Sequence, residues 1–576
     1  MTQQGRAGQR GRGGAGPGLR RDAVGLREVL FQSVTSMAPA AAVAVSIPAG
    51  AAYAGGALPL SVLIALVACL FTASSVAELA RQLPSAGSVA TYSAQGLHPI
   101  VGFLVAWTYL LVEALVPALL LLQLGFTVAD TLHQEWPGYP ADLWWPWVVA
   151  GAVVIVVTGF FGIRASARFG TVLGVFEVLV FVVLAVLLIA AAGRHNTLTV
   201  FGTSHAPPDH PGLSGVIAGS VYTVLAFAGF EAAAPLAEEA RDPRRTLRRA
   251  VLGAALSVGL LFVLTTYAIT VYVGPDAFAS FGPSGAASWD GVARASYGAF
   301  WVLIFLAVVN STVANANAAT NASTRTAFAL GRDGLFPRAF ARVHPVHRSP
   351  VVGLAAQFVI ALGAALLLGR AYGPRTAFLL LATVVVTAII AVYLLTNAAC
   401  AGYFLRRRRA AFRPVRHLLL PLLGIAAFTP ALLTAAGIPA FPFVEKLTAP
   451  VSYAGAGVAG WTAVGLVVVT VVWRRRPDAL AVTGLVGIEA EADPEAGPEP
   501  GPAPADGARA GASEPAARPG SPDPTARPGA PNSPARPGAP YSPARPGVSG
   551  PAGLPDAPRP GAPPEPSDPP HDEESR

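Results

Sequence analysis

The sequence predicts an all-α membrane protein with twelve transmembrane helices. Of its 576 residues, 53% are hydrophobic and only 12% are charged, which is outside the range of soluble domains. Apolar spans long enough to cross a bilayer recur along the first 476 residues. Both cysteines, Cys69 and Cys400, lie inside apolar stretches, so we expect no disulfide framework and no metal site built on cysteine.

The spans and two terminal segments divide the chain into three parts. Residues 1–27 are rich in Gly and Arg and lack the apolar core of a signal peptide, so they are expected to form a flexible basic arm. Residues 28–476 form the predicted transmembrane domain. Its spans are expected at residues 36–55, 57–80, 99–130, 144–162, 168–192, 213–237, 249–274, 298–324, 350–369, 376–405, 416–437 and 453–473.

Basic residues between the spans predict the orientation. With the N-terminus inside, the cytoplasmic segments hold 28 Lys and Arg residues and the opposite side holds 5. Basic residues concentrate on the cytoplasmic side of membrane proteins. We therefore expect a multi-pass protein of the cytoplasmic (plasma) membrane with both termini in the cytoplasm.

Residues 477–576 have a different composition, dominated by Pro, Gly, Ala and Ser. The unit Ala-Arg-Pro-Gly recurs four times with a period of nine residues, from 517–520 to 544–547. No core can form from such a segment, so a disordered tail is predicted. It is either a solvated linker or a docking segment for partners.

The first span is interrupted by Pro39, Pro48 and Gly50. Small residues follow the first of these breaks, and Ala40, Ala41 and Ala42 would let a ligand carboxylate approach backbone N–H groups at the positive end of a half-helix.

The sixth span has a matching interruption around Glu231. An ionised Glu near the middle of a bilayer costs roughly 3 kcal/mol, so it should face protein, water or a ligand. Gly229 and Pro235 flank it and weaken the backbone hydrogen bonds that a lipid-facing helix needs. The segment is either a kinked helix with a tolerated Glu or a discontinuous helix whose free backbone groups bind a ligand. Paired breaks five spans apart indicate an inverted repeat with the site between its halves.

Three acids, Glu113, Glu177 and Glu231, lie deep within spans, where no Lys or Arg is found. An acid without a fixed cation either takes up a proton or meets a mobile cation, such as a proton, Na⁺ or an ammonium group. Glu177 lies about 14 Å along its span from Arg168, close to the bilayer midplane. A protonated, hydrogen-bonded helix residue is the alternative for Glu177.

Other polar residues can be explained by structural roles as well as by functional ones. Glu113 could belong to a structural kink with Pro117 and Gln123. Ser311 and Asn315 share one face of the eighth span and either line a cavity or bond neighbouring helices. The histidines of one external loop, at positions 195, 205 and 210, fit no compact metal set.

Three motifs resemble the amino acid, polyamine and organocation transporter superfamily. They are Phe227-Ala-Gly-Phe-Glu231 with Glu238-Glu-Ala-Arg-Asp-Pro-Arg-Arg-Thr246, Leu83-Pro-Ser-Ala-Gly-Ser88, and Arg325-Thr-Ala-Phe-Ala-Leu-Gly-Arg-Asp-Gly-Leu-Phe-Pro337 followed by His344-Pro345 and Pro350. The resemblance covers roughly residues 27–476. It implies a leucine-transporter-like fold, with a five-plus-five inverted repeat, broken helices one and six and two extra helices. It also implies carriage of amino acids or related amines, often with protons.

The resemblance also locates two departures from the superfamily pattern. Many members hold the substrate carboxylate with a Gly-rich unwound segment of helix one, and the matching place here reads Ala41, Ala42 and Val43. Many carry a lysine in helix five that is implicated in coupling, and Glu177 occupies that place when residues 166–168 are aligned.

We therefore expect a secondary carrier that imports an amino acid or amine with protons, through a site between helices one, three, six and eight. The expected substrate-binding residues are Ala40, Ala41, Ala42, Val43, Phe227, Ala228, Gly229 and Phe230, and the expected coupling residues are Glu177, Glu231 and Glu113. The lipid bilayer is the expected surrounding, with no cofactor, metal or nucleic acid partner.

Two alternatives within transporters and three from other classes compete with this function. Within transporters, these are an exchanger and a Na⁺-coupled amino acid or polyamine carrier. A membrane-embedded enzyme is disfavoured, because no His lies deep in a span and no nucleophile has a plausible base. A passive channel would not explain the paired breaks. A scaffold acting through its tail would lose its function on deletion of residues 478–576, whereas a carrier would keep its uptake.

Overall fold

The computed structural model describes residues 25–475, except 86, 141, 162–165, 239, 282–285, 333–336, 345, 346 and 348. These residues form helices and loops, with no strand among them. The predicted tail (477–576) and residues 1–24 of the predicted arm lie outside the described part. The α-helices are α1 (Leu26–Met37), α2 (Pro39–Ala41), α3 (Ala51–Ala54), α4 (Leu58–Gln82), α5 (Ser88–Gly96), α6 (Pro99–Glu135), α7 (Trp145–Phe161), α8 (Ser166–Ala192), α9 (Leu213–Phe227), α10 (Pro243–Val273), α11 (Ala286–Tyr297), α12 (Phe300–Arg332), α13 (Val351–Tyr372), α14 (Pro374–Arg406), α15 (Leu420–Ala436) and α16 (Ala454–Arg475).

Shorter helical segments join or extend these helices. Two of them are π-helical, η1 (Ala42–Ser46) and η11 (Val415–Leu419). The others are 3₁₀-helices: η2 (Pro48–Gly50), η3 (Gly55–Ala57), η4 (Gly193–His195), η5 (Leu198–Phe201), η6 (Phe230–Glu238), η7 (Pro275–Ser280), η9 (Arg338–Ala341), η10 (Arg409–Ala411) and η12 (Val451–Tyr453).

The described helices account for the twelve predicted spans, one of them through a helix that is shorter than the others. Within the described residues, 11 helices reach the required length, and α7 is a shorter apolar helix. Only 17% of the apolar stretch in the span at Val451–Arg474 is buried inside the protein. Large apolar side chains such as Val467, which is 64% exposed, lie on its surface. Such a surface is typical of helices that face lipid.

The first span differs from the prediction. The structure places it at Leu26–Ser46, whereas the sequence predicted residues 36–55. Residues from Pro48 onward belong to the next span, which runs to Gln82. The polar residues Arg27, Glu28 and Gln32 lower the hydropathy of α1, although its other face is buried through Val29 and Val34. Hydropathy averaged along the sequence does not detect a half-helix in which only the side that faces the protein is apolar.

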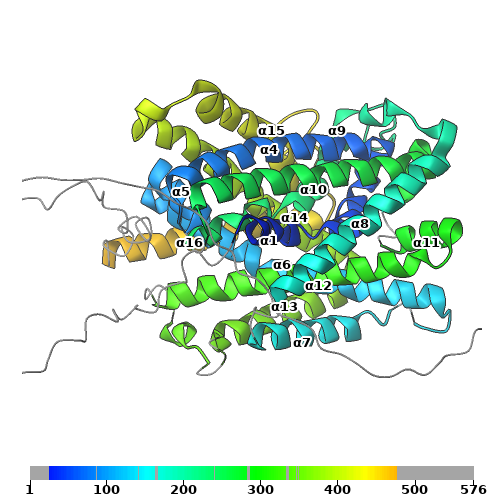
Figure 1. The fold of residues 1–576 in the computed structure, drawn as a ribbon, viewed down its shortest axis with the longest axis horizontal. Coiled ribbons are helices and arrows are strands. Elements are labelled where there is room, and N and C mark those ends of the chain that lie inside the picture. Colours follow the sequence, from blue (N-terminus) through cyan, green and yellow to red (C-terminus); the bar gives the residue numbers. More distant parts are fainter. Residues whose placement is uncertain are drawn as a thin grey trace, which may run out of the picture. The chain divides into compact units, whose positions relative to one another are not determined.

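Helix α1 lies at the centre of the bundle. Figure 1 shows the long helices side by side across the view, with α1 near the middle between α10 and α12. α1 also contacts η6, the short helix that follows α9. The first and sixth spans are therefore neighbours in the core.

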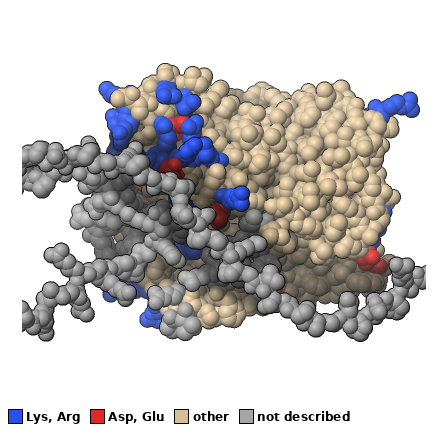
Figure 2. All heavy atoms as spheres, viewed as in Figure 1, with Lys and Arg blue, Asp and Glu red and all other residues tan. Residues whose placement is uncertain are grey.

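Charged side chains gather at the ends of the helices. Figure 2 shows most of the visible Lys and Arg residues at one end of the molecule, and uncharged residues over most of the remaining face. This distribution is typical of a protein whose middle part faces a bilayer.

Candidate functional site

The sixth span is broken between α9 and η6. α9 ends at Phe227, Ala228 is extended (φ −57°, ψ 129°), and Gly229 has a φ of 113°. Glycine tolerates this conformation because it has no Cβ. A Cβ added at Gly229 would lie 2.7 Å from the backbone carbonyl carbon and oxygen of Ser36. The sequence alternative of a merely kinked helix is therefore wrong here, because the helix is interrupted.

The first span is broken at Ala38. α1 ends at Met37, Ala38 has a φ of 45°, and Pro39 begins α2. Proline has no N–H and cannot continue the hydrogen-bond ladder of α1. α2 passes directly into the π-helix η1, so the predicted substrate residues lie just after the break.

The predicted substrate residues differ in burial. Those in the first span are at most 4% exposed: Ala40, Ala41, Ala42 and Val43. In the sixth span, Phe227 and Phe230 are fully buried, whereas Ala228 and Gly229 are partly exposed. Both sets lie at the breaks.

Hydrogen bonds join the two breaks through Ser33 of α1. Its hydroxyl donates to the carbonyl oxygen of Phe230 at 2.8 Å. The same hydroxyl oxygen accepts from the N–H of Ala233 at 3.1 Å. Together with the approach of Gly229 to Ser36, these bonds fix the start of η6 against α1.

Glu231 lies at the start of η6 and is 2% exposed. Its Oε2 accepts from the N–H of Gly229 at 3.2 Å and from the hydroxyl of Tyr393, on α14, at 2.8 Å. The ring of Phe230 packs against Tyr393 with 5.1 Å between the ring centroids. A carboxylate is favourable at a helix N-terminus because unpaired N–H groups point toward it.

Glu113 reaches the same cluster from α6. Tyr109 lies one helical turn before it, and the Tyr109 hydroxyl interacts with the carboxyl groups of both Glu113 and Glu231. Two predicted coupling residues are thus linked through one tyrosine.

Pro117 and Gln123 of α6 have partners other than Glu113. Near Pro117, the carbonyl oxygen of Ala114 accepts from the side-chain amide of Gln357 at 2.9 Å. The amide of Gln123 donates to the carbonyl oxygen of Ala41 at 3.0 Å. Gln123 therefore supports the break in the first span.

Glu177, the third predicted coupling residue, lies on the α12 side of the site. It is 3% exposed and interacts with the hydroxyl of Ser311 on α12. Its Oε2 has no hydrogen-bond partner within the described part of the chain. The structure therefore separates it from the Tyr109 cluster, which contacts α14.

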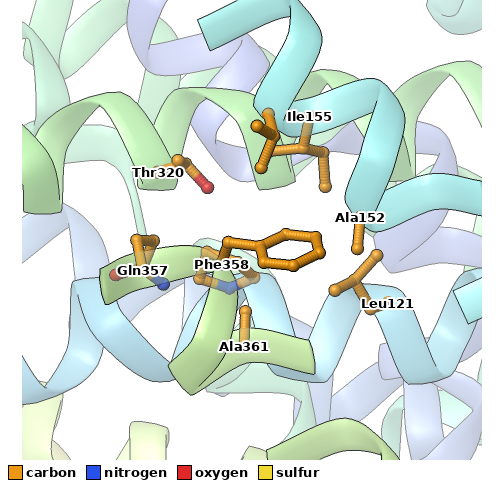
Figure 3. Close-up of a pocket in the computed structure, with 9 residues that line it drawn as sticks. Leu121, Ala152, Ile155, Thr320, Gln357, Phe358 and Ala361 are labelled. Carbon is orange, nitrogen blue, oxygen red and sulfur yellow. The ribbon is translucent and has the colours of Figure 1, made fainter. Parts of the chain in front are cut away.

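Of the predicted polar stripe on α12, Ser311 lies beside another helix, and two further polar residues of α12, Thr320 and Ser323, were not part of that prediction. Ser311 faces Glu177, whereas Ser323 bonds the side chain of Gln357 on α13 at 2.9 Å. Figure 3 shows Thr320 and Gln357 beside a cavity that is also lined by Phe358 and by residues of α6 and α7. Its volume is about 10 Å³, which is room for about one water molecule.

Sequence reasoning missed Ser33, Tyr109 and Tyr393. The signal was present, because a tyrosine hydroxyl in an apolar span needs a buried partner. The sequence did not show which acid each hydroxyl would meet.

Acids near the ends of the helices meet basic residues. Asp130 pairs with Arg375, and Glu135 pairs with Arg294. Two of the three histidines in the loop before α9 also lie beside acids. His205 lies 2.8 Å from Asp276, and His210 lies 2.5 Å from Glu445.

Comparisons with known proteins agree with the fold. The amino acid permease family model matches residues 28–480. The chain is 30% identical over 316 residues to the low-affinity putrescine importer PlaP of Escherichia coli (strain K12), covering 53% of this chain and 66% of that protein. It is 28% identical over 320 residues to the branched-chain amino acid permease BcaP of Bacillus subtilis (strain 168), covering 53% and 66%. It is 29% identical over 328 residues to cationic amino acid transporter 4 of Mus musculus, covering 52% and 48%.

These alignments span less than two thirds of each relative's length, whereas the family model covers most of the present chain. The relatives are named for different substrates, so they support the family but do not identify one substrate. The chain belongs to the amino acid permease family, within the superfamily that its motifs resemble.

Proposed function

We propose that this protein is a secondary active transporter that imports an amino acid or a related amine across the cytoplasmic membrane. It works by alternating access and is coupled to protons, with both termini in the cytoplasm. The contact between the two interrupted helices, at Gly229 and Ser36, carries this proposal. In transporters built on inverted repeats, substrate sites lie between two such breaks.

The substrate contacts the backbone and small side chains at the breaks. These are Ala40, Ala41, Ala42 and Val43 in the first span, and Phe227, Ala228, Gly229 and Phe230 in the sixth. Glycine at position 229 allows the chain to approach a ligand closely. The printed names of the relatives, which include a putrescine importer and amino acid permeases, support this choice of substrates.

Protons are carried by the buried acids. Glu177 is our main candidate, because its Oε2 lacks a partner in the described residues and its neighbour Ser311 is uncharged. Such an acid can take up a proton on one side of the membrane and release it on the other. Glu231 and Glu113 form the second acidic group, and their protonation changes with the charge of the bound substrate.

The test is uptake into proteoliposomes of a panel of labelled amino acids and amines. We expect accumulation when an inward proton gradient is imposed, and its loss when a protonophore collapses that gradient. Empty liposomes are the control. Accumulation that follows a Na⁺ gradient would identify a Na⁺-coupled carrier, and uptake only against preloaded substrate would identify an exchanger. No uptake of any panel member by the folded protein would contradict the proposal.

A further inference from the structure

We propose that a second ligand site lies in the cavity where the end of α6, the residue before α7 and the start of α14 meet. Its ligand is a zwitterion with an apolar side chain, an α-amino acid in solution. The inference goes beyond the proposed function, because this site is separate from the two helix breaks and its occupancy can be measured without transport.

The cavity has the size and the access that a small ligand needs. Its volume is about 270 Å³, close to the lower end of the range of small-molecule sites, which is roughly 300–1,000 Å³. It is lined by Phe126 and Asp130 of α6, by Trp144 and by residues 373–376. The side chains of Asp130 and Arg375 are 22% and 39% exposed, so a ligand can reach them from solvent. In the proposed orientation this is the outer side of the protein.

The cavity is distinct from the helix breaks. Arg375 lies at the start of α14, and Tyr393, which bonds Glu231, lies 18 residues further along the same helix. With a rise of about 1.5 Å per residue, the two positions are about 27 Å apart along the helix axis. A small ligand in this cavity therefore does not touch Glu231.

Two opposite charges lie in the cavity wall. The guanidinium group of Arg375 pairs with the carboxylate of Asp130 and lies over the ring of Phe126, with 5.0 Å from Cζ to the ring centroid. Phe126 is held edge to face by Phe378, with 5.8 Å between the ring centroids. The cation–π contact keeps the guanidinium group in place when Asp130 turns to another partner.

The ion pair can open for a zwitterion. A partly exposed ion pair contributes about 0–1 kcal/mol, so exchanging it for two contacts with a ligand costs little. The carboxylate of the ligand then pairs with Arg375, because a planar guanidinium group binds carboxylates through two parallel hydrogen bonds. The ammonium group of the ligand pairs with Asp130. A ligand with a single charge would leave one member of the pair without its partner.

Trp144 supplies the apolar wall of the cavity. A Cβ added at Gly369 of α13 would clash with the indole ring of Trp144, so the ring packs directly on the backbone of α13. The ring is partly exposed, and its remaining surface lies in the cavity wall. An apolar side chain of the ligand can pack there.

The test measures the reactivity of a cysteine placed in the cavity. Both native cysteines are fully buried, so a maleimide applied to Thr376→Cys reaches the introduced thiol. The full chain is placed in nanodiscs of phosphatidylglycerol, whose headgroup has no ammonium group. We expect leucine to slow the alkylation by at least about tenfold. Isoamylamine lacks the carboxylate of leucine and isocaproate lacks its ammonium group. Both should need at least about tenfold higher concentrations for the same protection.

Two further variants show whether the protection arises in the cavity. In Thr376→Cys with Arg375→Gln, protection by leucine should be lost, because its carboxylate has no partner. In Thr376→Cys with Arg294→Gln, protection should persist. Arg294 is the matched control, because it also joins an ion pair with a cation–π contact, to Glu135 and Trp301, outside the cavity lining. Size-exclusion profiles establish that the variants are folded.

Three outcomes would overturn the inference. They are no protection by leucine, equal protection by leucine and either single-charge analogue, and protection that survives Arg375→Gln. The last of these would assign the protection to closure of the protein around the helix breaks. None of them decides the proposed transport, because uptake into proteoliposomes is measured separately.

A lipid headgroup could also supply a zwitterion, and phosphatidylethanolamine tests this source. Adding this lipid to the nanodiscs should leave the alkylation rate of Thr376→Cys unchanged in the absence of leucine. Protection by the lipid, with no further protection by leucine, would assign the cavity to a headgroup and overturn the inference of a soluble amino acid.

Discussion

The centre and the ends of this bundle treat acidic residues differently. At the ends, acids lie beside basic side chains, as in Asp130 with Arg375, Glu135 with Arg294 and Glu78 with Arg81. In the centre, Glu231 and Glu177 meet hydroxyl and backbone N–H groups instead. Glu231 is satisfied as a hydrogen-bond acceptor, whereas Oε2 of Glu177 has no partner, and no fixed cation neutralises either acid within the described residues around the breaks.

The paired acids hold the ends of neighbouring helices together, whereas the unpaired central acids are the candidates for a role in transport. Ion pairs that are partly exposed contribute about 0–1 kcal/mol and mainly fix the ends of neighbouring helices. A buried acid without a cation is costly, and it persists where a proton or a substrate supplies the missing positive charge. In the proposed transport cycle, the central acids would change their charge, while the paired acids at the ends keep theirs.

The largest effect is expected when the central charge at the helix break is removed. Glu231→Gln keeps the size of the side chain but removes the carboxylate that accepts from Gly229 and Tyr393. Uptake should fall by about a hundredfold, because loss of a buried charged partner costs several kcal/mol. Tyr393→Phe, which removes one donor and leaves the charge, should reduce uptake less. Wild-type uptake by a folded Glu231→Gln protein would contradict the proposed difference between the central acids and those at the helix ends.

The second prediction separates binding from coupling. Glu177→Gln keeps a polar side chain of the same size beside Ser311 but cannot release a proton. Accumulation driven by a pH gradient should be lost, while counterflow exchange of substrate continues. Both assays can be run on the same proteoliposomes. Accumulation with the wild-type pH dependence would assign the proton to another group.

The third prediction concerns the close contact of the breaks. Gly229→Leu places a Cβ 2.7 Å from the backbone of Ser36, at a φ of 113° that other residues rarely adopt. The strain is on the order of 1–3 kcal/mol, so the half-saturation concentration should rise by about tenfold. Gly363→Leu is the control, because nothing lies within 4 Å of an added Cβ there. An unchanged half-saturation concentration would mean that the breaks are not the substrate site.

The smallest effect on transport is expected at Asp290 of α11, an acid outside the candidate spans. Burial raises the pKa of Asp290 to about 7, and the hydrogen bond from Thr131 opposes this only in part. Between the ordinary pKa and about 7, the folded protein binds a proton that the unfolded chain does not. Stability should therefore fall as the pH rises through this window, by up to about 4 kcal/mol.

The variant Asp290→Asn tests whether the stability falls with rising pH because of this residue. The amide is neutral at every pH, so the variant should unfold at a higher temperature than the wild type near pH 8 and at a similar temperature near pH 4. Thermal unfolding in detergent measures both, and uptake should change little. A wild-type pH dependence in the variant would assign the effect to other groups.

The sequence by itself determined the approximate positions of most spans and of the two breaks. Pro39 and Gly229 interrupt helices through the covalent structure of the backbone, which acts within a few residues and can be read locally. The same local reasoning found the three acids inside spans. It placed the first span ten residues too late, because the polar face of α1 lowers the average hydropathy that marks a span.

Only the tertiary structure decided what those acids meet. Tyr393 is 162 residues from Glu231, and Ser33 is 197 residues from Phe230, yet each pair is within hydrogen-bond distance. Gln123 reaches Ala41 across 82 residues. Such contacts depend on how whole helices pack, and many arrangements of twelve helices satisfy the same local pattern. The backbone therefore fixed where the two helices break, and helix packing fixed which groups the acids meet there.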